Sequence, residues 1–260
     1  ALDTRTKMGV LGDLNAYTFI DEEALDRARH LDERMSAGDA VPGPLAGVPV
    51  ALKDLIDQAG RVTTCGSSFY RAVPERSATV VRRLESAGAV VMGRTGLHEF
   101  AFGFSSENHW FGDVRNPWDP ATSPGGSSGG SAVAACAGLA SAAIGTDTGG
   151  SVRVPAALCG TVGLKVTHGR VPLTGVFPLA ASLDTVGPLA RTVEDAEALY
   201  SVMAGHDPDD PWSVPRTAGE TLSGRVTGLA IGVPQPWVEG APLTGETAAV
   251  FADTLDRLAD

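Results

Sequence analysis

A strand, a helix and a second strand follow one another along the first part of this chain, and their order constrains the fold more than any other feature. The first apolar run, VPVAL, covers residues 48–52 and is followed directly by Lys53. The segment SATVVRRLESAG then repeats its apolar residues at helical spacing, and AVVMGRT is a second short apolar run. Two strands joined through a helix usually lie parallel in one sheet. We therefore predict an α/β fold.

Further regular elements are predicted on both sides of this unit. The charged segment from Asp21 to Gly38 predicts a surface helix, and its apolar face would consist of Leu25, Ala28, Leu31 and Met35. Later segments predict helices at SAVAACAGLA, TVEDAEALYSVMAG and TGETAAVFADTLDRLAD, and strands at SAAIGTD, SLDTVGPLA and LAIGV. Residues 104–131 show no periodicity, and an irregular stretch of this length usually serves a function.

Charge and cysteine content narrow the class of partner. The formal net charge is −11, without a lysine or arginine run, which argues against direct contact with nucleic acid or a membrane surface and favours a small-molecule partner. The three cysteines lack metal-site spacing and indicate reduced thiols in a cytoplasmic protein. We expect neither a metal nor a cofactor. No apolar stretch approaches the ~18 residues that a membrane span needs, and residues 1–10 do not resemble an export signal.

Two clusters of glycine and serine are the strongest candidates for a functional site. They are PGGSSGGS at residues 124–131 and GTDTGGS at residues 145–151. A flexible linker is a weak interpretation of the first cluster, because linker composition normally extends further and does not adjoin a buried helix. A phosphate-binding loop is also weak, because neither the P-loop lysine nor a GxGxxG pattern is present.

A nucleophile elbow is a sharper alternative for the first cluster. Residues 126–130 satisfy GxSxG, which would make Ser128 the nucleophile of an α/β-hydrolase-type esterase. Such an enzyme needs a downstream acid and histidine. Only His168 and His206 follow, and His206 lies in a polar, turn-like segment. Neither histidine is a convincing base.

A buried lysine can serve as the base of a serine nucleophile instead. Lys53 ends an apolar strand, where desolvation would favour the neutral amine, although an ion pair with Asp54 or Asp57 remains an open alternative. In the second cluster, the glycines before Ser151 allow successive backbone N–H groups to point towards one oxyanion. The candidate donors are Thr148, Gly149 and Gly150. For Asp147 and Arg153 we favour an ion pair that pins this loop.

Long segments of the chain closely resemble the signature regions of the amidase signature family. They are GVPVALKD, NPWDPATSPGGSSGGSAVA and GTDTGGSVRVPAALCGTVGLKVT, and the similarity continues to about Pro211. The resemblance implies a catalytic triad of Lys53, Ser127 and Ser151, in which Ser127 follows a cis peptide bond and relays protons between Lys53 and the nucleophile Ser151. It also assigns Gly125, Gly126 and Ser128 to substrate binding.

The same resemblance implies a fold and an activity. The fold would be an α/β/α sandwich around a large mixed, mostly parallel sheet, forming one domain over residues 1–260 that is incomplete at its C-terminus. The activity placed first is hydrolysis of a small carboxamide or aryl amide by a free-standing amidase. Such an amidase could form a homodimer. The alternative is the A subunit of a tRNA-dependent amidotransferase, which would release ammonia from glutamine and act with partner subunits. A noncatalytic binding homologue is a third, weaker interpretation.

Overall fold

The computed structural model describes residues 14–40, 42–215 and 227–259 of the chain. Contacts divide the chain into two compact units, one up to residue 216 and one from residue 217. The expectation of one domain over residues 1–260 stays a prediction.

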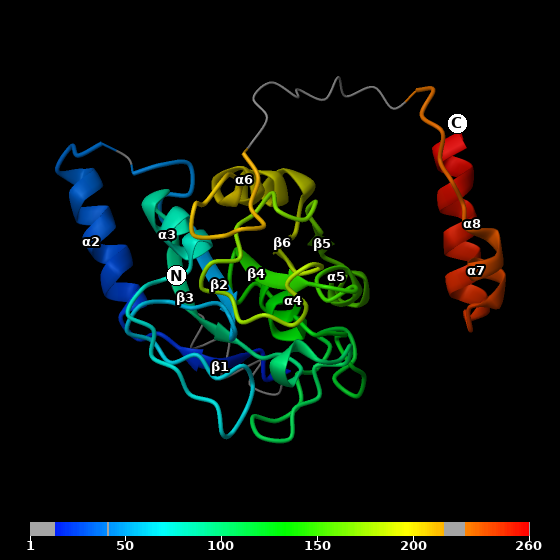
Figure 1. The fold of residues 1–260 in the computed structure, drawn as a ribbon, viewed down its shortest axis with the longest axis horizontal. Helices are drawn as coiled ribbons and strands as arrows, with labels where there is room; N and C mark the ends of the chain where they lie inside the picture. Colours follow the sequence, from blue (N-terminus) through cyan, green and yellow to red (C-terminus); the bar gives the residue numbers. More distant parts are fainter. Residues whose placement is uncertain (1–13, 41, 216–226, 260) are drawn as a thin grey trace. The chain divides into compact units, whose positions relative to one another are not determined.

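The larger unit is built on a six-stranded sheet with the order β1-β3-β2-β4-β6-β5 (Figure 1). Its strands are β1 Tyr17–Ile20, β2 Pro49–Lys53, β3 Val90–Thr95, β4 Ala142–Asp147, β5 Val162–Gly163 and β6 Thr185–Ala190. The sheet is mixed, as predicted. It is less parallel than expected, because parallel pairing joins β2 to β3 and β4, whereas β1, β6 and β5 pair antiparallel with their neighbours. The parallel part is therefore the centre of the sheet.

Helices cover both faces of this sheet, which confirms the sandwich. They are α3 Thr79–Ser86, α4 Gly129–Cys136, α5 Arg153–Cys159 and α6 Val193–Met203. Side chains of the central strand alternate between the layers: Val50 and Leu52 belong to the core that contains α3 and α6, and Ala51 belongs to the core that contains α4 and α5. The two helical layers that the resemblance implied are therefore present in the larger unit.

Close packing holds α4 against the sheet. A Cβ atom on Gly130 would lie 2.5 Å from the backbone of Ala16 and Gly96, so only glycine fits there. The next residues of the helix, Ala132 to Ala134, are fully buried. Small side chains at this interface bring the helix start close to the ends of β2 and β4. As a consequence, the serines of the first glycine cluster lie at the carboxyl edge of the parallel strands.

The predicted surface helix is present as α2 Ala24–Ser36, but its buried face differs from the expectation. Ala24 and Ala28 pack against Val90 and Met92 of β3. Leu25 and Met35, which were placed on the apolar face, are 43% and 40% exposed. The helix touches the sheet only at its first turns, because it begins directly after the edge strand β1.

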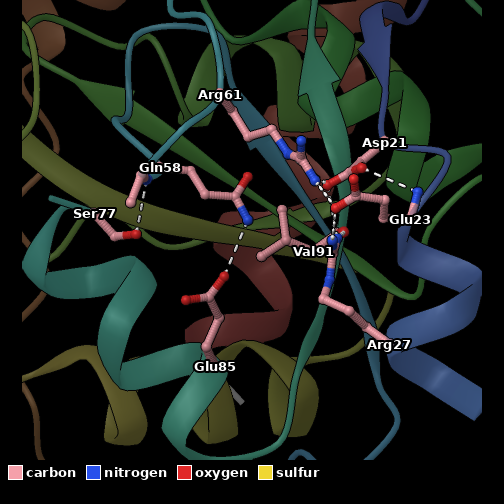
Figure 2. Close-up of polar contacts among 9 residues, drawn as sticks. Asp21, Glu23, Arg27, Gln58, Arg61, Ser77, Glu85 and Val91 are labelled. Carbon is pink, nitrogen blue, oxygen red and sulfur yellow. Dashed lines mark hydrogen bonds and ion pairs between the residues drawn. The ribbon is translucent and has the colours of Figure 1, made fainter. Parts of the chain in front are cut away.

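A buried carboxylate ties α2 to the sheet (Figure 2). Arg27 Nη2 donates to Asp21 Oδ2 and to the carbonyl of Val91, each at 2.8 Å. Arg61 Nε donates to the same Asp21 oxygen at 3.1 Å, and Arg61 also pairs with Glu23. Two guanidinium groups thus neutralise one buried acid and connect the helix to the loop that follows β2.

The smaller unit contains α7 Gln235–Gly240 and α8 Gly245–Ala259. Helix α8 confirms the last predicted helix. The predicted strand LAIGV is wrong: residues 229–233 have no regular structure, and Leu229 and Ile231 are 66% and 54% exposed. A strand needs a neighbour for its backbone hydrogen bonds, and the described residues of the smaller unit contain no strand.

Cys65, Cys136 and Cys159 carry free thiols, as predicted. The described helices include none with the length and apolarity to cross a bilayer. The edge strands β1 and β5 and the short helices α5 and α7 were not predicted from the sequence. Each of these four elements is too short to show a clear period.

Candidate active site

Lys53 is the last residue of β2, and its amine lies inside the protein. The residue is fully buried. Its Nζ lies 2.7 Å from Ser127 Oγ and 2.9 Å from Thr146 Oγ1. Strand β2 runs between β3 and β4 in the centre of the sheet, so both flanks of Lys53 are covered. The lysine amine therefore faces two hydroxyl groups and is shielded from solvent.

The ion pair that the sequence left open for Lys53 is absent. Asp54 instead accepts hydrogen bonds from the Thr64 backbone at 3.1 Å and from the Thr18 hydroxyl at 3.2 Å. Asp57 accepts from the Thr63 hydroxyl at 2.8 Å. Both carboxylates that follow Lys53 within four residues thus have other partners.

Burial changes the protonation of this amine. Desolvation lowers the pKa of Lys53 to about 7, even though the charges of Asp147 and Asp184 act to raise it. A free lysine has a pKa of ~10.4 and is almost entirely protonated at neutral pH. In this site a large fraction is therefore the uncharged amine, which can accept a proton from Ser127.

Ser127 is held by its backbone as well as by Lys53. The peptide bond between Gly126 and Ser127 is cis, as the resemblance implied. The carbonyl of Ser127 accepts the N–H of His98 at 3.2 Å and the hydroxyl of Ser106 at 3.3 Å. A Cβ on Gly126 would lie 2.8 Å from the Ser106 nitrogen, which requires glycine at that position. These contacts direct the Ser127 hydroxyl to the lysine.

Ser128 has a structural role in this arrangement. Its hydroxyl is fully buried, donates to the Thr146 carbonyl at 3.1 Å and accepts the Thr146 N–H at 3.2 Å. The rings of His168 and His206 bond to Asp184 and Ser213 and not to Ser128. The esterase alternative therefore lacks both an accessible nucleophile and a base. The Ser128 hydroxyl is thus engaged with the Thr146 backbone, and the expected role of Gly125, Gly126 and Ser128 in substrate binding stays a prediction.

Ser151 lies beside these residues, in the loop between β4 and α5. Its carbonyl accepts the N–H of Ser128 at 3.1 Å, so the two glycine clusters, far apart in the chain, are in contact. Ser151 is 3% exposed. Because Ser128 directly follows Ser127, this contact places Ser151 near the pair of Lys53 and Ser127.

Asp147 determines the shape of the loop before Ser151. Its carboxylate accepts the N–H of Gly150 at 2.8 Å and that of Val152 at 3.0 Å, and it pairs with Arg153 at 2.9 Å. Burial raises the pKa of Asp147, but the hydrogen bonds from Arg153 and the backbone outweigh this effect, so the net pKa is lowered. The expected pairing of Asp147 with Arg153 is confirmed.

This geometry changes the set of oxyanion donors. The N–H of Gly150 was expected to face the oxyanion, but it is occupied by Asp147. The backbone N–H groups of Thr148, Gly149 and Ser151 have no acceptor within the described ranges. These three groups are therefore the candidate donors, and Gly150 instead contributes its left-handed conformation, with φ +140°.

Two residues of the site were not found from the sequence. Thr146 contacts the lysine amine, and Asp184 accepts a hydrogen bond from Thr148 Oγ1 at 2.5 Å. Asp184 also accepts the N–H groups of Leu179 and Ala180, each at 2.9 Å. For Thr146 the sequence offered one indication: it lies two residues after Ile144 in the predicted strand, so both side chains are expected on the same face. Asp184 precedes β6, and nothing in its local sequence marks it.

Comparison with known proteins places these residues in a family context. A family model described as Amidase matches residues 10–260. The A subunit of the glutamyl-tRNA(Gln) amidotransferase of Carboxydothermus hydrogenoformans is 50% identical over 229 residues, covering 86% of this chain and 47% of that protein. The chain therefore spans about half the length of this curated relative.

Solved structures agree with this similarity. A crystal structure of an amidase superposes with a TM-score of 0.85 at 40% identity, covering 98% of this chain and 56% of that one. The native peptide amidase of Stenotrophomonas maltophilia superposes with a TM-score of 0.77 at 42% identity, covering 80% of this chain and 44% of that one. Both of these proteins are therefore considerably longer than this chain.

Proposed function

Because this chain belongs to the amidase family, we propose that the protein cleaves an amide C–N bond through an acyl-enzyme on Ser151. The observation that carries the proposal is the buried amine of Lys53, 2.7 Å from the Ser127 hydroxyl. A serine without a histidine needs another base, and a neutral lysine that acts through a second hydroxyl provides one.

The reaction begins when Ser151 Oγ attacks the amide carbonyl carbon. The Ser151 proton passes to Ser127 Oγ, while the Ser127 proton passes to the neutral amine of Lys53. The carbonyl oxygen becomes an oxyanion, held by the backbone N–H groups of Thr148, Gly149 and Ser151. One such donor is worth ~3 kcal/mol in other hydrolases, and positioned proton transfer contributes ~10² to 10⁴-fold.

Collapse of this intermediate breaks the C–N bond. Lys53 returns its proton through Ser127 to the leaving nitrogen, which departs as ammonia or an amine. A water molecule then attacks the acyl carbon and gives its proton to the same relay, and Ser151 leaves as the free hydroxyl. The carboxylic acid product is released, and both serines and the neutral lysine are restored.

The comparisons favour the amidotransferase alternative over the free-standing amidase for the identity of the amide. Curated relatives 46% to 50% identical to this chain are named as the A subunit of glutamyl-tRNA(Gln) amidotransferase. We therefore place glutamine first as substrate, with a partner subunit that receives the ammonia. Hydrolysis of a free amide stays the second candidate, because the solved structures at similar identity include a peptide amidase.

Covalent labelling tests nucleophile and substrate together. The full-length protein is treated with a serine-reactive probe in the presence of a panel of amides that includes glutamine, and the labelled peptide is identified by mass spectrometry. We expect the label on Ser151, its loss in Ser151→Ala, and protection by the true substrate. Label on Ser128, or near-normal turnover by Ser151→Ala, would contradict the mechanism. Copurification of a second subunit would separate the amidotransferase from the free-standing amidase.

A further inference from the structure

A cavity of about 540 Å³ lies beside the candidate active site, and its composition differs from that of the catalytic residues. Its wall contains four phenylalanine rings and one carboxylate, from Phe69, Phe100, Phe102, Phe177 and Glu99. The volume lies in the range of ligand sites, roughly 300 to 1,000 Å³. We call it the Glu99 cavity.

Two walls of the Glu99 cavity are joined to the catalytic loops by hydrogen bonds. His98 lines the cavity, and its N–H donates to the carbonyl of Ser127 at 3.2 Å. Leu179 lines another part, and its N–H donates at 2.9 Å to Asp184, which holds Thr148 through its other oxygen. The cavity is therefore placed to receive a substrate group that extends from the reacting amide.

The carboxylate of Glu99 has an unpaired oxygen within the described part of the chain. Its Oε1 atom is buried and forms no hydrogen bond. Glu99 is the one acidic side chain that lines the cavity, and no described lysine or arginine lines it. A shielded carboxylate oxygen without a donor is costly, so such a group calls for a cationic or hydrogen-bonding ligand.

The aromatic rings add a second preference for a cation. Phe100 packs against Phe69 and Phe177 with ring centroids 5.6 Å and 5.4 Å apart. Phe102 is 80% exposed, so its ring is available to a ligand. The faces of such rings attract an ammonium or guanidinium group. Carboxylate and rings thus favour the same chemistry.

Two successive residues at this wall have a strained backbone. Phe100 and Ala101, in the short 3-10 helix η2 Glu99–Ala101, have φ values of 50° and 61°. Residues other than glycine rarely adopt this left-handed region, and the surrounding structure must compensate for it. The strained turn directs Glu99, Phe100 and Phe102 to one cavity. Strain of this kind is common at ligand sites.

We propose that the Glu99 cavity is a substrate subsite that binds a cationic group, an ammonium or guanidinium, carried by the substrate amide. This inference rests on the proposed function and narrows its substrate class to amides with a positive charge remote from the carbonyl. Glutamine belongs to this class through its α-ammonium group. The net charge of −11 favours the approach of such a substrate.

Binding to an inactive variant tests the subsite separately from hydrolysis. Full-length Ser151→Ala protein is titrated by calorimetry with ω-amino alkanamides of increasing chain length. Each is matched with the alkanamide in which a methyl group replaces the ammonium. We expect the ammonium form to bind about ten-fold more tightly at the chain length that spans the site. Equal binding of both forms at every length, or no binding of either, would overturn the proposal.

Substitutions in the same background assign the effect to this cavity. Glu99→Gln keeps the shape of the side chain and should reduce the preference for the ammonium form to about one. Phe102→Leu removes an exposed ring without disturbing the core and should lower the preference a few-fold. The matched control is Glu107→Gln, an exposed acid outside this cavity, which should leave the preference unchanged.

These measurements separate failure of the subsite from failure of the proposed function. A preference that persists in both Glu99→Gln and Phe102→Leu would refute the role of this cavity, even if Ser151 were acylated as proposed. Conversely, loss of the preference in both variants would support the subsite even if the serine probe labelled another residue.

Discussion

The uncharged state of Lys53 can be tested through the pH dependence of stability. Its pKa is lowered from 10.5 to about 7 in the folded protein. Between these values the unfolded chain holds the proton and the folded chain does not, so raising the pH favours the folded state. Each pH unit in this interval raises the free energy of unfolding by up to ~1.4 kcal/mol. Well below pH 7 the amine is protonated in both states, so the contribution of Lys53 does not change with pH.

The perturbation is Lys53→Met, which keeps the length of the side chain and removes the amine. Urea denaturation of the full-length wild type and variant is measured from pH 5 to pH 9. We expect the stability of the wild type relative to the variant to be nearly constant up to about pH 6 and to rise by about 2 kcal/mol between pH 7 and pH 9. The exposed Lys165 provides the control. The difference in stability between wild type and Lys165→Met should show no such rise with pH.

A difference between wild type and Lys53→Met that stays flat from pH 7 to pH 9 would refute the reasoning. In that case the folded protein would keep the proton on Lys53 throughout this interval. The lysine could then not accept a proton from Ser127 at neutral pH, and the proposed relay would fail.

Three further predictions concern the same site. The pH profile of kcat/KM should rise to a plateau with a midpoint near 7, because only the neutral amine of Lys53 is a base; a profile that falls through this range would contradict it. Ser128→Ala should lower the free energy of unfolding by ~1 to 3 kcal/mol, since the Thr146 N–H loses its acceptor, while probe labelling of Ser151 continues. Asp147→Asn should slow acylation at least ten-fold in burst kinetics and lower the free energy of unfolding by ~2 kcal/mol, because the loop before Ser151 loses charge-assisted hydrogen bonds. An unchanged acylation rate would show that the loop does not need these hydrogen bonds.

The positions of the catalytic groups illustrate how a sheet assembles a site. Lys53 ends β2, Asp147 ends β4, and Ser127 precedes α4, which packs on both strands. Carboxyl ends of parallel strands meet at one edge, where loops can place polar groups on a rigid support. Among the described strands, parallel pairing joins only β2, β3 and β4, and the site lies at the end of this part of the sheet.

The sequence by itself determined the local elements and the chemistry of the site. Apolar periodicity is a local property, so β2, α3, β3, α4, β4, β6 and α6 were predicted at their observed places. The glycine clusters and the strand-end lysine indicated a serine nucleophile with an unusual base. The resemblance to the amidase signature family added Ser127 and the cis peptide bond, which the structure contains.

Only the tertiary structure decided how these groups act. Lys53 and Ser127 are 74 positions apart in the chain, and the low pKa of the lysine depends on burial by strands that do not adjoin it in sequence. The capture of the Gly150 N–H by Asp147 and the unpaired carboxylate oxygen of Glu99 are likewise matters of which groups meet in space. Burial and hydrogen-bond partners arise from contacts between distant segments, and no local pattern of residue types records them.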